Sequence, residues 1–326
     1  MRDISNFLVR DLKDDEKITE PGFYRIPMER HHGQPCDGVS VTSSVLRKME
    51  IQTPADVWAF HGLNPDRYER EQTDALRMGR AMAAFIEGGP EELERHFRVL
   101  PKDKPKRPTE VQLTAFKEGR ASDAALKSIY FWQKVEEDPR DIVTEAEWEL
   151  ICNMGKVLAQ DPAASAALGG EPEITMAWYD HETDLWCLAR PDQTSFDGML
   201  SDYKKVNTQG RPFSYRVCDN RITDHGYHQQ MAFAREGFVS LIGEEPQQVG
   251  LVFQVDKAPY HVILREVDEE ALAIGEFQNR RARRLFRECL DSNNWWGPGE
   301  DIGAYQMPSW FRERLIEEMQ TAGVAP

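Results

Sequence analysis

Two aspartates and a lysine near the middle of the chain have the types and spacing found in hydrolytic metal sites. They lie in residues 188–206, LARPDQTSFDGMLSDYKKV. Asp192 follows one apolar run, and Asp202 and Lys204 lie in the next. Side chains two apart in a strand point to the same face, so Asp202 and Lys204 are expected to project together. The connection between the two runs is long enough for Asp192 to return beside Asp202.

Two carboxylates on adjacent strands would offer the oxygen ligands that Mg²⁺ or Mn²⁺ takes, together with waters and a substrate phosphate. Such a metal lowers the pKa of a bound water and offsets charge on the phosphate. Lys204 could orient that water and stabilise developing negative charge. The pattern D-x-K is common by chance, however, and the alternative is a pair of strand ends carrying solvated charges.

The elements that must position these residues can be read from the apolar patterns. The runs EITMAWYD, LWCLARPD and MLSDYKKV predict a meander of three strands, the first two joined by the polar turn HETD. A helix is expected in DHGYHQQMAFAREGFVSLIG. Two further strands, VGLVFQVD and YHVILREVD, and a helix from about residue 269 to 290 follow.

The N-terminal half is predicted to be mainly helical. Residues 1–37, punctuated by Pro and Gly, are expected to form an irregular arm. Helices are expected in SVTSSVLRKM, in residues 73–87 up to the stop at Gly88-Gly89-Pro90, and within residues 120–168. The basic, Pro-rich stretch LPKDKPKRPTE is expected to be either a solvated linker or a phosphate-contacting loop. This order predicts a single α/β domain over residues 38–326, with helices flanking a mixed central sheet.

Composition limits the possible functions. The chain has 326 residues, 40% of them hydrophobic, and a formal net charge of −16. Nucleic-acid binding depends on Lys and Arg, so any such function needs a locally basic surface or channel. No apolar run approaches the roughly 20 residues that span a bilayer. The charged N-terminus does not resemble a signal peptide, so a cytoplasmic protein is expected. The five scattered cysteines predict reduced core thiols.

Several stretches together resemble one enzyme family. ARPD…DYKK is followed by GYHQQMAFAREG, in which Tyr227, His228, Gln230, Ala232 and Phe233 match a family helix. FQVDKAPYHVILREVDEEALAIG, VSVTSSVLRKMEIQTPADVW and MGRAMAAFIEGG are similar to further family segments. Over residues 38–312 the chain resembles the exonuclease VIII (RecE-type) family of phage and prophage nucleases, within the PD-(D/E)XK superfamily.

The resemblance implies a restriction-endonuclease-like core and a metal-dependent DNA exonuclease that acts on linear double-stranded ends in phage-type recombination. Asp192 and Asp202 would bind Mg²⁺ or Mn²⁺, Lys204 would act on the water, and Gln230 would help to position the site. A ring-like homo-oligomer and a single-strand annealing recombinase as partner are also implied.

Two positions depart from the family pattern. Ala83 stands where the family carries a metal-binding histidine, and a methyl group cannot ligate a metal. Glu87 lies one helical turn later and could substitute, or it could be a surface residue at a helix end. Lys205 stands where the family commonly has Thr. The alternatives are therefore a weakened or silent homologue that binds DNA ends or a recombinase, and an unrelated function on the same fold.

Other residues could have a functional or a structural role. Arg280, Arg283, Arg284 and Arg287 share one helix face and could follow DNA phosphates with Lys205, or they could pair with acids such as Glu276 and Glu288. His31-His32 shows no metal spacing, and His228 could be a cap, a packing residue or a catalytic group. The tryptophans at 295, 296 and 310 could stack on bases, but packing of the tail is favoured.

Overall fold

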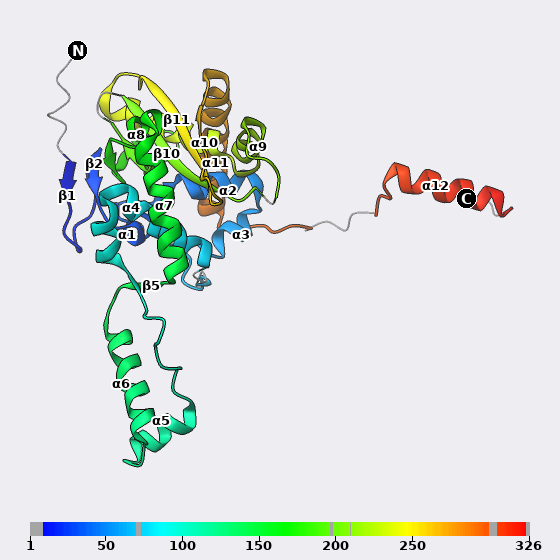
Figure 1. The fold of residues 1–326 in the computed structure, drawn as a ribbon. Helices are drawn as coiled ribbons and strands as arrows, with labels where there is room; N and C mark the ends of the chain where they lie inside the picture. The colour runs from blue at the N-terminus through cyan, green and yellow to red at the C-terminus, as the bar shows by residue number, and fades with distance from the viewer. Residues whose placement is uncertain (1–8, 70–72, 196–197, 209, 300–304, 324–326) are drawn as a thin grey trace.

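The computed structural model describes residues 9–69, 73–195, 198–208, 210–299 and 305–323 as a mixed α/β fold. The described strands form two five-stranded sheets and one two-stranded sheet (Figure 1). The first sheet has the order β1 (Val9–Asp11), β2 (Gly22–Arg25), β7 (Thr175–Asp180), β8 (Leu185–Ala189) and β3 (Ser40–Thr42). The second has the order β12 (Val262–Glu266), β11 (Gln248–Val255), β10 (Met199–Val206), β9 (Gln193–Thr194) and β6 (Glu171–Pro172). The small sheet pairs β4 (Phe97–Val99) with β5 (Asp141–Val143).

The described helices fall into four groups along the chain. The first group is α1 (Met28–His32), α2 (Ser43–Ile51), α3 (Pro54–Trp58) and α4 (Asp74–His96). The second is α5 (Glu110–Lys117), α6 (Asp123–Glu137), α7 (Glu145–Gln160) and α8 (Pro162–Ala167). The third is α9 (Tyr215–His225), α10 (Tyr227–Ile242) and α11 (Glu269–Ser292), and the last is α12 (Ser309–Thr321). Among the described residues, no helix is long and apolar enough to cross a membrane.

A bent ribbon of two antiparallel strand pairs joins the two large sheets. β7 pairs with β8 in the first sheet, and β6 pairs with β9 in the second. The chain passes between the sheets once at Glu173 and once at residues 190–192, where the Glu173 N–H donates to the Asp192 carbonyl at 3.0 Å. The ribbon therefore places Asp192 at the junction of the two sheets.

Helix α10 is the centre of the largest apolar core. Its buried Phe233 packs on Trp178 of β7, with ring centroids 4.7 Å apart. Gly237, one turn later, makes room for the same indole, because a Cβ there would lie 2.6 Å from it. The same cluster contains Leu200 of β10 and Phe253 of β11 from the second sheet. Both sheets consequently share one core, and α10 is held rigidly beside β10.

A second core forms where α4 and α7 pack against the second sheet. Met78, Met82 and Leu93 of α4 meet Ile151 and Met154 of α7. Thr73 caps α4 by accepting from the N–H of Leu76. The helical geometry breaks at Gly88 and Gly89, where Gly89 has φ +67°, and a second helical segment continues to His96. The expected stop at Gly88-Gly89-Pro90 is therefore a kink, since a proline fits the first turn of the new segment.

Residues 100–140 form a helical arm, defined as the segment between β4 and β5. It contains α5 and α6 and extends away from the body, to which the β4–β5 sheet attaches it (Figure 1). Helix α12 also lies apart from the body in the same view, and none of its residues is buried.

The structure corrects three expectations. Residues 9–37 are not an irregular arm, because β1 and β2 extend the first sheet and Phe23 and Tyr24 are buried. The three runs around Asp192 do not form a meander, since β8 pairs with β3 and β10 lies in the other sheet between β9 and β11. The strands accordingly form two large sheets rather than one central sheet. That residues 38–326 are a single domain stays a prediction.

Candidate active site

The structure brings Asp192, Asp202, Lys204 and Gln230 together at the junction of the two sheets. Asp202 and Lys204 project from the same side of β10, and the Lys204 ammonium forms an ion pair with Asp202 Oδ2. Gln230, in the first turn of α10, donates from Nε2 to Asp202 Oδ1 at 2.7 Å. Its Oε1 lies 3.4 Å from the Lys204 Nζ. One amide thus fixes the orientation of both charged groups.

Asp192 is tied to the same strand by its side chain. Its Oδ2 accepts the backbone N–H of Tyr203 at 2.7 Å, which places it against β10 next to Asp202. Asp202 is only 2% exposed, whereas Asp192 and Lys204 keep some contact with solvent. The cluster therefore combines a buried carboxylate with a carboxyl and an ammonium that are partly exposed.

Burial and mutual charge control ionisation in this cluster. Burial raises the pKa of Asp192 to about 8, and the nearby charge of Asp202 adds to the effect. Burial lowers the pKa of Lys204, but the carboxylates of Asp202 and Asp192 outweigh it and the net shift is upward. Lys204 therefore remains a cation, with its Nζ 4.4 Å from the centre of the Tyr227 ring. A site with two close carboxyls and one ammonium favours an additional positive charge.

The donor set fits a metal of the Mg²⁺ type in part. Asp192 and Asp202 supply oxygen ligands, and such ions complete their coordination with waters and phosphate oxygens. Within the described residues there is no group of three or more His, Cys, Asp or Glu side chains placed to hold a metal. A metal here would depend on these two carboxylates and on the substrate.

Glu87 and Ala83 lie on α4. Glu87 is exposed, and its pKa is raised by partial burial and then by the charges of Glu173 and Glu92. The same Glu173 charge also helps to raise the pKa of Asp192. The charge of Glu173 thus acts on both Glu87 and Asp192. In the described residues Glu87 does not complete a group of three metal ligands.

Two residues near the site were missed from the sequence. Glu173 pairs with Arg190 across the bend of the ribbon, next to Asp192. Arg47 of α2 donates to the carbonyl of His225 at 3.0 Å and lies over the Tyr227 ring, 5.7 Å from its centre. Burial lowers the pKa of Arg47, while the charge of Asp202 acts in the opposite direction. Neither residue lies in a chemical motif, so only tertiary structure reveals them.

The arginine face of α11 is largely neutralised. Arg283 is buried between Asp180, at 3.2 Å, and Glu236, at 2.6 Å. Arg284 pairs with Glu182, and Arg287 pairs with Asp291. Only Arg280 of the four is exposed without an ion pair in the described part of the chain. The face therefore balances acidic neighbours, but these partners are not the expected Glu276 and Glu288.

The remaining candidates have structural contacts. Lys205 lies 3.7 Å from Asp256. His31 is buried and its Nδ1 lies 3.1 Å from Thr175 Oγ1, while His228 contacts Gln278 of α11 at 2.7 Å. Trp295 stacks on Trp58 with centroids 4.3 Å apart. The tail before residue 300 thus packs on α3.

Comparison with solved structures finds proteins of similar fold. No family model matches the chain, and no curated protein matches it. Its fold is similar to the crystal structure of a protein from Eubacterium rectale named "Putative exonuclease", with a TM-score of 0.52 and 12% sequence identity. The match covers 92% of this chain and 99% of that one. The chain therefore shares the fold of that protein over nearly its whole length.

Proposed function

We propose that the chain is a metal-dependent deoxyribonuclease of the PD-(D/E)XK type. The observation that carries the proposal is the cluster of Asp192, Asp202, Lys204 and Gln230. Lys204 pairs with Asp202, Gln230 donates to Asp202, and the Asp192 carboxyl accepts the N–H of Tyr203 on the same strand. The similarity of fold to a protein named as an exonuclease supports it.

In this proposal Asp192 and Asp202 hold Mg²⁺ or Mn²⁺, which supplies an acidified water and charge neutralisation on the phosphate. Lys204 holds and orients the attacking water and stabilises the charge that develops on the phosphoryl oxygens. Gln230 holds the side chains of Lys204 and Asp202 in a fixed relative orientation. Tyr227 lies under the ammonium and limits its motion. Phosphodiester hydrolysis is the reaction that this arrangement best serves.

The substrate we propose is the end of linear double-stranded DNA, in phage-type recombination. The support is the sequence resemblance around Asp192, Asp202 and Tyr227. A ring-like homo-oligomer and an annealing recombinase as partner belong to the same proposal. An oligomer would let a basic inner surface coexist with the net charge of −16.

A second candidate is a silent homologue that binds DNA ends or a recombinase without cleavage. Ala83 motivates it, because the family histidine is absent and no three-ligand group forms in the described residues. Loss of one ligand or its support commonly costs about 10- to 100-fold in metal affinity or activity.

Digestion of end-labelled linear duplex DNA with Mg²⁺ or Mn²⁺ separates the two candidates. We expect the natural chain to cleave, and Lys204→Ala and Asp202→Asn to lose at least about 100-fold in rate, because each removes charge at the reacting phosphate. The covalently closed form of the same DNA controls for a requirement for ends. Cleavage only by Ala83→His would identify a silent nuclease. Equal cleavage by Lys204→Ala would contradict the proposed site.

A further inference from the structure

The helical arm, residues 100–140, differs in charge from the rest of the molecule. It carries nine Lys and Arg residues and seven Asp and Glu residues, for a net charge of +2. The remaining residues therefore carry −18. Three of the seven acids lie together at positions 136–138, where α6 returns to the body. The outer part of the arm is consequently a basic projection from an acidic protein.

Many of the arm's cations have no acidic partner in the described structure. They are five exposed lysines, Lys104, Lys106, Lys117, Lys127 and Lys134. The arginine face of α11 shows the opposite arrangement, because Arg283, Arg284 and Arg287 each pair with a carboxylate. An unpaired ammonium can exchange counterions for phosphate without first breaking an ion pair.

The basic segment before α5 is fixed along α6 and is not a loose linker. Trp132 Nε1 donates to the carbonyl of Pro105 at 3.0 Å, and Ser128 Oγ donates to the carbonyl of Lys106 at 2.6 Å. The guanidinium of Arg107 lies over the Trp132 ring, 4.5 Å from its centre. The lysines beside these anchors therefore have a fixed backbone. A fixed surface loses less entropy when it binds an extended charged ligand.

Helix α6 adds an aromatic residue between two of the lysines. Lys127, Tyr130 and Lys134 follow spacings of three and four residues and so share one face of the helix. Tyr130 is 53% exposed, and its ring meets that of Phe116 of α5 edge-on at 5.9 Å. Lysines flanking a held aromatic ring suit a sugar-phosphate backbone.

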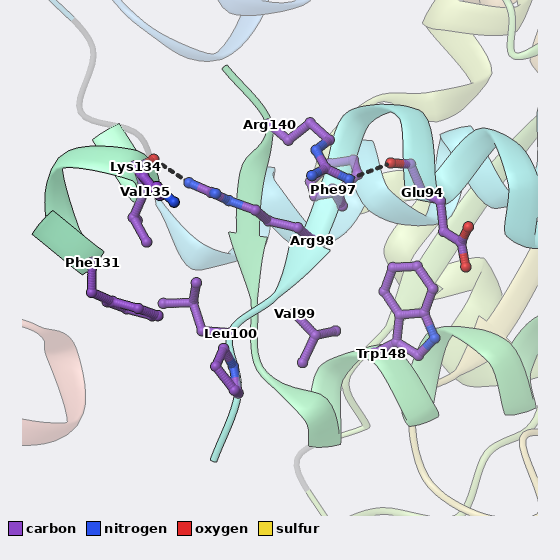
Figure 2. A pocket seen from close by; sticks show the side chains of 11 residues that line it. Glu94, Phe97, Arg98, Val99, Leu100, Phe131, Lys134, Val135, Arg140 and Trp148 are labelled. Atoms are coloured by element: carbon purple, nitrogen blue, oxygen red, sulfur yellow. Dashed lines mark hydrogen bonds between the residues drawn. The ribbon is translucent and has the colours of Figure 1, made fainter. Parts of the chain in front are cut away.

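The positive surface continues to the root of the arm. A hollow of about 600 Å³ lies there, lined by Lys134 and Phe131 of α6 and by Arg98, Arg140 and Trp148 (Figure 2). Arg98 and Arg140 share the carboxylate of Asp138, at 3.0 and 2.7 Å. Two guanidinium groups on one carboxylate leave a local excess of positive charge, and the lining of the hollow contains one acid, Glu94.

We propose that the helical arm is a DNA-holding element that binds the phosphate backbone of duplex DNA, independently of sequence, while the end of that duplex is at the site of Asp202 and Lys204. This inference rests on the proposed nuclease function for its ligand. The binding surface comprises Lys104, Lys106, Lys127, Tyr130 and Lys134.

The test compares two triple variants that change the charge equally. The arm variant is Lys106→Gln/Lys127→Gln/Lys134→Gln, and the control is Lys13→Gln/Lys17→Gln/Lys156→Gln, in which all three lysines are also exposed. Binding of a fluorescein-labelled linear duplex is measured by anisotropy in EDTA over a range of salt concentrations. Melting temperatures of both variants establish that they fold.

For the arm variant we expect at least about a tenfold loss of affinity, and a salt slope of log K smaller by about three, because three phosphate contacts are lost. The control should change by less than about twofold under the same conditions. Lys→Arg replacements at the three arm positions should restore binding, since the charges return.

Cleavage by the same proteins separates this inference from the proposed function. Weak binding by the arm variant with no cleavage by any protein would support the arm and reject the nuclease. Cleavage by the natural chain with unaltered binding by the arm variant would reject the arm alone. If the natural chain does not bind duplex DNA, or if the two triple variants lose affinity equally, the arm proposal is overturned.

Discussion

Asp192 is the residue whose ionisation ties stability to pH. Burial and Asp202 raise its pKa to about 8, whereas in the unfolded chain the group titrates near its ordinary value of about 3.9. Between these two values the folded protein binds a proton that the unfolded chain has lost. The contribution of Asp192 to stability is therefore full below about pH 4 and decreases as pH rises toward 8.

Asp192→Asn removes this dependence and keeps an oxygen that can accept the Tyr203 N–H. We expect the variant to gain stability over the natural chain by up to about 1.4 kcal/mol for each pH unit between 5 and 7. Urea unfolding at several pH values measures the difference. The exposed Asp14→Asn serves as the matched control and should give a constant difference. Parallel curves for Asp192→Asn would contradict the raised pKa.

The sequence predicted that Asp192, Asp202 and Lys204 would lie together, because they are close along the chain. Asp202 and Lys204 share a face by the alternation of a strand, and Asp192 needs only a short connection to reach them. Gln230 followed from the family resemblance. Arg47 and Glu173 could not be found, since each approaches the site only through the packing of α2 and the bend of the ribbon.

At the scale of elements, the close contact of α10 and α11 positions Gln230. Gly275 of α11 lies directly against α10, where a Cβ would come within 2.9 Å of the Gln229 Cα and the His228 carbonyl oxygen. This neighbour is backbone and cannot move as a side chain does. A side chain at position 275 must therefore push α10, and Gln230 with it.

Gly275→Ala is expected to destabilise the protein by about 1–3 kcal/mol through overpacking. It should also slow DNA cleavage beyond the loss of folded protein, because Gln230 shifts. Gly79→Ala is the matched control, since it is exposed on α4 with nothing within 4 Å of the added Cβ. That change should stabilise by up to about 1 kcal/mol, from helix propensity. Thermal unfolding measures both, and equal effects of the two variants would refute the argument.

The pairing of the strands was harder to predict than their positions in the sequence. The runs for β7, β8, β10, β11 and β12 were all located correctly, and β11 pairs antiparallel with β12. The predicted pairing of β7 with β8 is also confirmed, whereas β10 pairs with β9 and β11 and not with β8. Apolar alternation identifies a buried face but not the neighbouring strand. β3, only three residues long, completes the first sheet beside β8 and gives no strand signal of its own.

At the scale of the whole molecule, the C-terminal segment divides into a packed part and an unpacked part. Trp295 stacks on Trp58 and meets Phe286 edge-on, with centroids 5.4 Å apart. Helix α12 has no buried residue, and Trp310 is 66% exposed. The two parts should therefore contribute very differently to stability.

Truncation after residue 299 should leave the free energy of unfolding within about 0.5 kcal/mol of the full chain, because surface changes of this kind rarely cost more. Trp295→Ala, by contrast, should cost more than about 1 kcal/mol through the loss of aromatic contacts. Urea denaturation of the two proteins is the measurement. A large loss on truncation would mean that α12 packs on the body or on a second copy in solution.

The bent ribbon has a mechanical consequence. Both of its strands run from one large sheet into the other, with Glu173 and Arg190 paired across the bend beside Asp192. Asp192 lies where the chain crosses between the sheets, whereas Asp202 lies on β10 of the second sheet, so a shift of one sheet against the other is expected to change the separation of the two carboxyls. A substitution deep in the shared core, far from both carboxyls, is therefore expected to alter their separation.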